Sequence, residues 1–326
     1  MDFKRKRSKR RTTWILMMMP VLGALAQTSP IDVLAEKKFG FSVISKGDNI
    51  PDFPIREDNK DLLLMALHKN IDISEFKTKT GFSHSKIDML LRFLEEKNYI
   101  QHMGGLLKPA IFIADADDGR RLFTDALPVS REIVKAIKES LPSIKGQFNR
   151  TDMSKSRGFE DWAFFILSDV LLDNWQIDNV EREFLKTTTR PPRHGKNYYI
   201  SMLERNEKNE PFGLYGNQVG DISIYGNNRI GRKAATTENK VSASDLLLLD
   251  KMAADFFPRL LEILEKTRKY AEKIHVDSGY AKEIAFGEFY IWWYHFIYTK
   301  ATDLMAEDRM LTLPADGNFF YQVIEN

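Results

Sequence analysis

The sequence predicts a mainly helical α+β protein, and three patterns indicate this fold class. Apolar residues recur at helical spacing in several segments of the second half of the chain. Over about residues 197–230 the pattern becomes strand-like and is interrupted by Gly and Asn turns. Nearer the N-terminus, three helical segments precede a hairpin-like segment. We therefore expect a small N-terminal domain followed by a helical domain, residues 128–326, that carries a small antiparallel sheet.

Residues 1–26 have the pattern of a secretory signal peptide. Seven Lys and Arg residues precede an uncharged apolar run, Trp14–Ala26, which is shorter than the roughly 20 residues needed to span a bilayer. The run ends in Ala24-Leu25-Ala26, a small-x-small pattern suited to cleavage. We expect export to the periplasm or the extracellular space after cleavage near Ala26. An uncleaved membrane anchor and a basic nucleic-acid-binding arm are the alternatives.

Loss of this leader reverses the net charge. The whole chain has 48 basic and 46 acidic residues, and residues 1–26 hold seven basic and one acidic. The remainder therefore has 41 basic and 45 acidic residues, a net charge of −4. This balance argues against a nucleic-acid partner. The chain has no Cys, which excludes disulfides, thiolate metal sites and Cys nucleophiles.

Residues 27–58 predict an extended lead-in with one strand at Phe39–Ile44. From residue 59 the apolar spacing predicts three helices, the third capped by Ser83. Residues 99–115 then predict two strands about the turn Gly104-Gly105, with residues 111–113 on the returning strand. This order of elements over residues 59–115 resembles the winged helix-turn-helix superfamily, and the resemblance implies a winged-helix-like domain at 59–127.

In a DNA-binding member of that superfamily, the third helix would face the major groove. The side chains that would face the DNA are His84, Ser85, Lys86 and Arg92 on this helix, and His102 and Lys108 on the hairpin. Because Asp88, Glu95 and Glu96 oppose phosphate binding, we expect a scaffold or protein-contact module, with DNA binding as the alternative.

The following segments predict helices. Residues 115–119 fit the acidic N-terminus of a helix better than a calcium loop. Residues 128–146 form an amphipathic pattern, and 159–172 are strongly apolar, as in a core helix. Asp169 and Asp173 lie one turn apart there. We interpret them as the solvated edge of a buried helix, with a carboxylate pair for acid–base chemistry as the alternative.

Two features near the predicted sheet suggest ligand binding. A cationic loop beside Pro191 and Pro192 could clamp an anion or carboxylate, or could be an exposed linker. A Tyr-Gly-Asn motif occurs at Tyr215 and again at Tyr225, and suits either recognition of a polar ligand or turns at strand ends. The candidate ligand-binding residues are Arg190, Arg193, His194, Lys196, Tyr215, Asn217, Gln218, Tyr225, Asn227, Asn228 and Arg229.

The last third predicts a long helix from Ser242 or Ser244, kinked at Pro258, and then a buried helix at 286–298 that is apolar nearly all round. Glu288, Trp292 and His295 share one face of that buried helix by their spacing. They could line a pocket, or His295 could be a core residue with a satisfied hydrogen bond.

The sequence contains no His-Glu-x-x-His, Gly-x-Ser-x-Gly, P-loop or dinucleotide motif, and its six His residues lack metal-ligand spacing. We expect no metal and no cofactor. The leading hypothesis is an exported, non-enzymatic binding or assembly protein that recognises a protein partner or a polar ligand. One alternative is a DNA-binding regulator. The other is an extracytoplasmic hydrolase whose dispersed carboxylates would come from Asp161, Glu204, Glu283 or Glu288.

Overall fold

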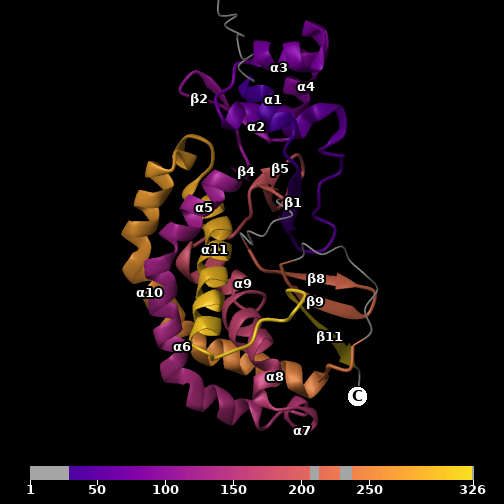
Figure 1. The fold of residues 1–326 in the computed structure, drawn as a ribbon. Helices are drawn as coiled ribbons and strands as arrows, with labels where there is room; N and C mark the ends of the chain where they lie inside the picture. Colours follow the sequence, from indigo (N-terminus) through magenta and orange to yellow (C-terminus); the bar gives the residue numbers. More distant parts are fainter. Residues whose placement is uncertain (1–28, 206–212, 228–236, 325–326) are drawn as a thin grey trace, which may run out of the picture.

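The computed structural model describes residues 29–205, 213–227 and 237–324 (Figure 1). Over these ranges the protein is a mainly helical α+β fold with small sheets, which confirms the predicted fold class. The predicted leader, residues 1–26, and the candidate residues Asn228 and Arg229 lie outside the described ranges. Within those ranges, every helix is too short or too polar to cross a membrane.

The N-terminal module comprises residues 30–113 and contains three consecutive helices followed by a hairpin. Asp72 and Ser83 cap the second and third of these helices, and Gly81 ends the second with a positive φ. Gly104 and Gly105, both with positive φ, form the hairpin turn. The elements are α1 (Pro30–Ala35), β1 (Phe39–Ile44), η1 (Glu57–Asn59), α2 (Lys60–His68), α3 (Ile73–Thr80), α4 (His84–Glu96), β2 (Ile100–Met103), β3 (Leu106–Pro109) and β4 (Phe112–Ala114). The order of α2, α3, α4 and the hairpin is the one that the sequence predicts. The helix α1 is not, because the sequence predicts an extended lead-in over residues 27–58.

A three-stranded sheet separates this module from the rest of the chain. Its central strand is β7 (Tyr199–Glu204), which runs antiparallel to β1 and parallel to β4. Ile200 and Met202 join the apolar core of the module, whereas Tyr199 and Leu203 pack on the core of the helices below. Because alternate side chains of a strand point to opposite faces, one strand serves both cores. We call the sheet of β1, β7 and β4, together with the contacts between the module and the helices below it, the junction.

The position of β7 corrects two predictions. The strands expected to form one sheet over 197–230 belong to two different sheets, because β7 pairs with β1 and β4 while the later strands pair elsewhere. The residues 111–113, expected on the returning strand of the hairpin, lead into β4 of the junction sheet instead. A strand that is apolar on both faces is typical of a sheet covered on both sides.

The remaining helices form the helical body. Asp115 caps α5 through a reciprocal capping box with Asp118, as its acidic start predicts, and Ser242 caps α10 in the same way with Asp245. The predicted kink does not end α10, which continues through Pro258. The elements are α5 (Ala116–Asp125), α6 (Leu127–Phe148), α7 (Met153–Ser156), α8 (Phe159–Phe164), η2 (Phe165–Val170), α9 (Ile177–Asn179), η3 (Val180–Phe184), α10 (Ala243–Asp277), η4 (Tyr280–Lys282) and α11 (Phe286–Glu307). Both η2 and η3 are π-helical.

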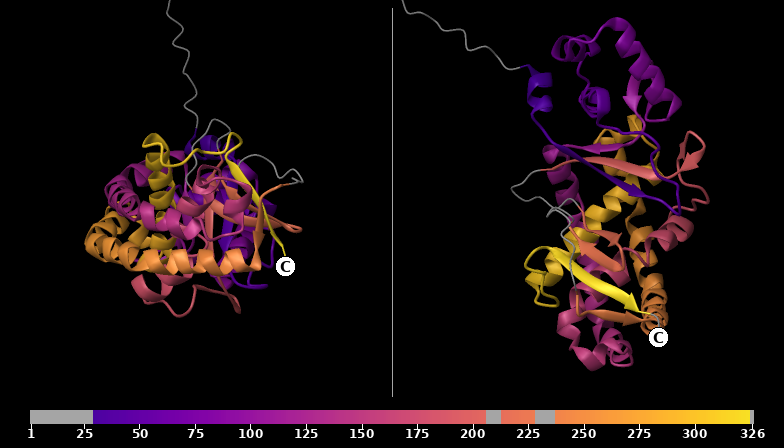
Figure 2. Two further views of the ribbon diagram at one scale, coloured as in Figure 1. Left: turned by 90° about the horizontal axis from the view of Figure 1, so that it is seen from below. Right: turned by 90° about the vertical axis from the view of Figure 1, so that its right-hand side faces the viewer.

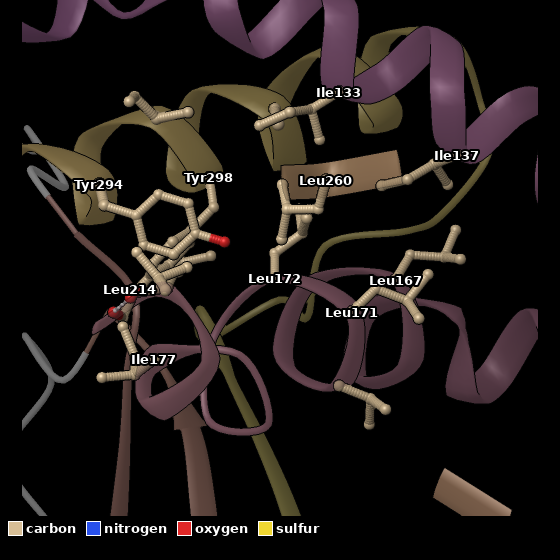
Figure 3. Close-up of a cluster of buried hydrophobic side chains, with 14 of the residues drawn as sticks. Ile133, Ile137, Leu167, Leu171, Leu172, Ile177, Leu214, Leu260, Tyr294 and Tyr298 are labelled. Atoms are coloured by element: carbon tan, nitrogen blue, oxygen red, sulfur yellow. Dashed lines mark hydrogen bonds between the residues drawn. The ribbon is translucent and has the colours of Figure 1, made fainter. Parts of the chain in front are cut away.

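The helix α11 lies in the middle of the body. It packs against α5, α6, α10 and η2, and most of its side chains are buried, as the sequence predicts for a helix that is apolar nearly all round. Figure 3 shows how the layers meet: Ile133 and Ile137 of α6 face Leu260 of α10, and Tyr298 of α11 lies close to Leu214. This core surrounds the polar residues described below.

A second sheet, in the order β10-β11-β9-β8, covers one side of the body (Figures 1 and 2). Gly220, with a positive φ, turns the hairpin between its last two strands. The strands are β8 (Tyr215–Val219), β9 (Ile222–Gly226), β10 (Lys240–Ser242) and β11 (Asn318–Ile324), and a separate short hairpin is made by β5 (Pro192–Arg193) and β6 (Lys196–Asn197). Figure 2 shows the N-terminal module at one end of the molecule and this sheet nearer the other.

Candidate functional site

Arg193 of the predicted cationic loop points into the protein. Its side chain is 4% exposed, and Nη2 donates to Glu288 Oε1 at 2.6 Å and to the Ala110 carbonyl oxygen at 2.9 Å. Nη1 donates to the Asn98 carbonyl oxygen at 2.8 Å. Because this guanidinium already binds an internal carboxylate, the predicted anion clamp is wrong at Arg193, which instead ties the module to α11.

Arg190 is occupied in the same way. Its Nε and Nη2 donate to the two carboxylate oxygens of Glu181 at 2.8 and 2.7 Å, a forked pair in the geometry that guanidinium favours. Lys196 Nζ donates to the carbonyl oxygens of Asp48 and Ile50, both at 3.1 Å. The loop is therefore neither a clamp for an external anion at Arg190 nor a free linker, because it is fastened to its surroundings.

His194 is the exposed member of the loop. Its side chain is 46% exposed, and its Nε2 lies 3.8 Å from Glu96 Oε1 at the end of α4. The residue has a positive φ in the turn of the β5–β6 hairpin. This placement brings His194 near the N-terminal module and away from the Tyr-Gly-Asn residues.

The repeated Tyr-Gly-Asn motif covers the helical body, with its two Tyr side chains turned inward. Tyr225 is fully buried, and its hydroxyl lies 2.7 Å from Ser168 Oγ. The partly buried Tyr215 stacks on the ring of His295, with centroids 5.1 Å apart. Asn217 Oδ1 accepts from the Gln218 backbone N–H at 2.9 Å. The Tyr side chains thus serve the core.

The other polar residues of this hairpin support its turn and its end. Gln218 Nε2 donates to the Gly220 carbonyl oxygen at 3.1 Å. Asn227 is half-buried, and its side chain occupies the space that a Cβ atom at Gly317 would need. These contacts are the ones expected of Asn and Gln residues at strand ends.

The three residues predicted to share a face of α11 are all buried but have different partners. Glu288 binds Arg193, as described above, while Trp292 and His295 are in ring contact at 5.3 Å. His295 Nδ1 is hydrogen-bonded to the Ile291 carbonyl oxygen at 2.7 Å. Burial lowers the pKa of His295 to about 4, so the imidazole is neutral at ordinary pH. His295 is thus a core histidine with a satisfied hydrogen bond.

Three of the four carboxylates that the hydrolase alternative would need are bound to cations of the chain. Asp161 is exposed, Glu204 is partly buried, and Glu283 and Glu288 are buried. Glu204 Oε2 lies 2.9 Å from Lys37 Nζ, Glu283 binds His68, and Glu288 binds Arg193. Each side chain is therefore explained by its own ion pair.

His68 is the centre of a charged network across the junction. Its Nδ1 lies 2.8 Å from Glu283 and its Nε2 lies 3.1 Å from Asp118 Oδ2. Burial alone would lower the pKa of His68, but the hydrogen bonds and charges of these two acids outweigh burial and raise it to about 9. Lys69 Nζ adds contacts of 2.6 and 2.9 Å to Asp118 and Asp115. Sequence reasoning missed this network because its partners are far apart along the chain.

Asp169 and Asp173 form a buried acidic pair inside the helical body. Asp169 is inaccessible and Asp173 is 3% exposed, so the predicted solvated edge is wrong. Burial raises the pKa of both carboxyls well above the usual range, and the charge of Asp173 adds to the effect on Asp169. Asp169 lies in the π-helical turn η2, a kind of distortion found frequently at functional sites.

The module also presents an exposed surface built from α4 and the hairpin tip, which we call the α4–hairpin surface. It carries three large apolar side chains: Met89 is 47% exposed, Met103 39% and Leu106 61%. His102 Nε2 lies 3.6 Å from Glu95 Oε1 and connects the hairpin to α4. The exposed residues of α4 on this surface are His84, Ser85, Asp88, Met89, Arg92, Glu95 and Glu96.

The lysines on and beside α4 face acids of the same module. Lys86 Nζ lies 3.0 Å from Asp58 Oδ2, and Lys97 Nζ lies 2.9 Å from Asp52 Oδ2. Lys108 is buried and donates to Asn70 Oδ1. Three of the cations in this part of the module are therefore engaged internally.

Comparison with known protein families, with curated proteins and with solved structures found no match to this chain. Among the described residues, no group of three or more His, Asp or Glu side chains is placed to hold a metal ion.

Proposed function

We propose that this chain is an exported, non-enzymatic binding or assembly protein that contacts a protein partner through the α4–hairpin surface. The observation that carries the proposal is the exposure of Met89, Met103 and Leu106 on connected elements of one small module. Exposed apolar side chains of this size, edged by charged residues, are typical of protein-contact surfaces. The basic and apolar leader supports a partner outside the cytoplasm.

The charges of this surface favour a protein over a nucleic acid. Asp88, Glu95 and Glu96 outnumber Arg92 among the exposed charged residues of α4. Binding to DNA depends on Lys and Arg that can neutralise phosphates, and Lys86 is already paired with Asp58. The matching partner would present apolar side chains beside basic ones, because such a surface complements both features.

Photo-crosslinking from defined positions tests the proposal. A photoreactive residue at Met89 or Leu106 should give one discrete cross-linked product in the native host. The same residue at Leu247, which is 71% exposed on α10, should not give that product and serves as the control. Adding Met103→Glu should abolish the product, because a charge in the apolar contact is costly to bury. Equal products from all three positions, or none from Met89 and Leu106, would contradict the proposal.

A DNA-binding measurement tests the alternative that this chain contacts DNA. The full chain without residues 1–26 should bind duplex DNA no more tightly than a net-negative control protein does at physiological salt. Binding that weakens steeply with added salt and is lost in Arg92→Ala would instead favour DNA contact.

A further inference from the structure

Three hydroxyl groups near Asp169 and Asp173, those of Ser168, Tyr225 and Thr302, give their protons to acceptors other than the two acids. Thr302 Oγ1 donates to the Tyr298 carbonyl oxygen at 2.8 Å, so Ser168, 2.7 Å away, must donate to Thr302. Tyr225 must then donate to Ser168, 2.7 Å away. Because each hydroxyl carries one proton, this chain has none left for a carboxylate.

Two further hydroxyls of α11 follow the same pattern, whereas the buried Tyr294 hydroxyl has no partner among the residues that the structure describes. Tyr298 donates to the Leu214 carbonyl oxygen at 2.7 Å, although its hydroxyl is also within hydrogen-bonding reach of Asp173. Figure 3 shows Tyr298 beside Leu214 in the apolar core. Thr299 donates to the His295 carbonyl oxygen at 2.6 Å and accepts from the Leu214 backbone N–H at 3.0 Å. The protons of Tyr298 and Thr299 are thus directed at backbone carbonyl oxygens.

The two carboxyls are correspondingly short of hydrogen bonds. Asp169 Oδ1 accepts from the Asn174 backbone N–H at 3.3 Å, and the Asn174 side chain is also within hydrogen-bonding reach of Asp169. The Oδ2 atoms of Asp169 and Asp173, and the hydroxyl of Tyr294, are buried and have no partner in the structure. An unsatisfied buried polar atom costs about 1–3 kcal/mol, so a source of donors is expected in the folded protein.

No cation of the described chain balances the pair. Among the described residues, neither carboxyl forms an ion pair with Lys, Arg or His, and the charge that raises the pKa of Asp169 is that of Asp173. The titratable groups that the acids influence in turn are Tyr225 on β9, Tyr321 on β11, and Tyr294 and Tyr298 on α11. His295, stacked between Tyr215 and Trp292, is neutral. The helix α10, which also packs on η2, adds no charge to the pair.

We propose that Asp169 and Asp173 act as a proton-holding pair and make the helical body sensitive to pH. Near neutral pH the folded protein retains at least one proton on the pair, and this proton supplies the missing hydrogen-bond donor. In alkaline solution the proton passes to solvent, two adjacent buried carboxylates remain, and their repulsion loosens the contacts of η2 with β9 and α11. A proton is favoured over a metal ion because, in the described part of the chain, no third His, Asp or Glu joins the two acids.

Infrared spectroscopy of the full chain tests the pair directly. A protonated buried carboxyl has a C=O stretch that is separate from the carboxylate bands. The wild-type protein should show this band at neutral pH, and the band should decline as the pH rises. Asp169→Asn combined with Asp173→Asn should remove most of it. Asp118→Asn is the matched control, because His68 and Lys69 lower the pKa of Asp118 and keep this carboxyl ionised at neutral pH.

Two results would overturn the proposal. A wild-type band that is absent at neutral pH, or unchanged in the double variant, would show that the pair is ionised. A melting temperature that Na⁺, K⁺, Mg²⁺ or Ca²⁺ raises in the wild type but not in the double variant would show that a metal ion replaces the proton. The absence of the band from the wild type decides the first point even if the double variant does not fold.

Discussion

The junction and the helical body both bury ionisable side chains, but they surround them differently. At the junction, Arg193 faces Glu288, and His68 lies between Asp118 and Glu283, so each buried charge has an opposite charge at hydrogen-bonding distance. In the helical body, Asp169 and Asp173 form no ion pair among the described residues; Asn174 donates to Asp169, while Tyr225 and Tyr298 donate to other acceptors.

The difference teaches that burial and pairing act on pH dependence in opposite directions. His68 and Lys69 lower the pKa of Asp118 against the effect of burial, so its contribution to stability is present above the usual carboxyl pKa and is lost in acid. The unpaired acids have raised pKa values, so they stabilise the folded state least in alkaline solution. Acid should therefore weaken the contacts of Asp118, and alkali the helical body. Glu288 differs from Asp118, because burial outweighs Arg193 there and raises the pKa of Glu288 to about 7.

The largest expected effect comes from removing one partner at the junction. Arg193→Met leaves Glu288 buried without its cation and also removes the donors to Asn98 and Ala110. We expect a loss of about 3–5 kcal/mol in the free energy of unfolding, measured by urea denaturation. Arg182→Met, at an exposed pair with Glu183, is the control and should cost at most about 1 kcal/mol. Similar losses in both variants would contradict this account.

A smaller loss is expected for His68→Gln. Asp118 keeps Lys69 and Arg121 as partners, so about 2–3 kcal/mol is expected at neutral pH. The pKa of His68 is raised, so its contribution is complete below about pH 6.5 and is lost as the pH rises through about 9. The difference in the free energy of unfolding between the wild type and His68→Gln should therefore shrink in alkaline solution. A difference that stays constant with pH would show that His68 acts through packing alone.

In the helical body, Asp173→Asn should stabilise the protein. The folded pair binds more protons than the unfolded chain from about pH 4 upward, so stability falls as the pH rises through the raised pKa values of the pair. The neutral amide of Asn avoids this loss. We therefore expect the free energy of unfolding to rise by about 1–2 kcal/mol in mildly alkaline solution and to change little near pH 5. Equal stability changes at both pH values, by thermal or urea unfolding, would argue against the pair as the cause.

The smallest effects on stability are expected on the α4–hairpin surface. Leu106 is 61% exposed, so Leu106→Glu should change the free energy of unfolding by no more than about 0.5 kcal/mol. In the same variant, a photoreactive residue at Met89 should no longer give the cross-linked product with the proposed partner. A large loss of stability would indicate that this side chain belongs to the fold and not to a contact surface.

Local patterns predicted most of the elements but not their partners. The caps Ser83, Asp115 and Ser242 could be predicted because capping needs residues only a few positions away. The strand at residues 199–204 could also be predicted, but its neighbours could not, since pairing depends on distant segments. Its apolar residues on both faces were the signal that it lies between two layers.

The candidate site was harder to predict for the same reason. Glu288 lies 95 positions from Arg193, and no local pattern connects them. Asp169 and Asp173 could have been found, because a segment that is apolar all round has no solvated edge to hold an acid. The donor shortage around them depends on Leu214, Tyr225 and Tyr298, which only the folded chain brings together.

Hydrogen exchange at two pH values tests the contrast between the two regions most directly. Protection factors, corrected for the intrinsic effect of pH, should be measured in the wild-type chain near about pH 5 and about pH 8. We expect protection in η2 and the facing part of α11 to fall at the higher pH, while α2 and β7 keep theirs, because His68 remains charged. A uniform fall, or an earlier fall at α2 and β7, would contradict the account.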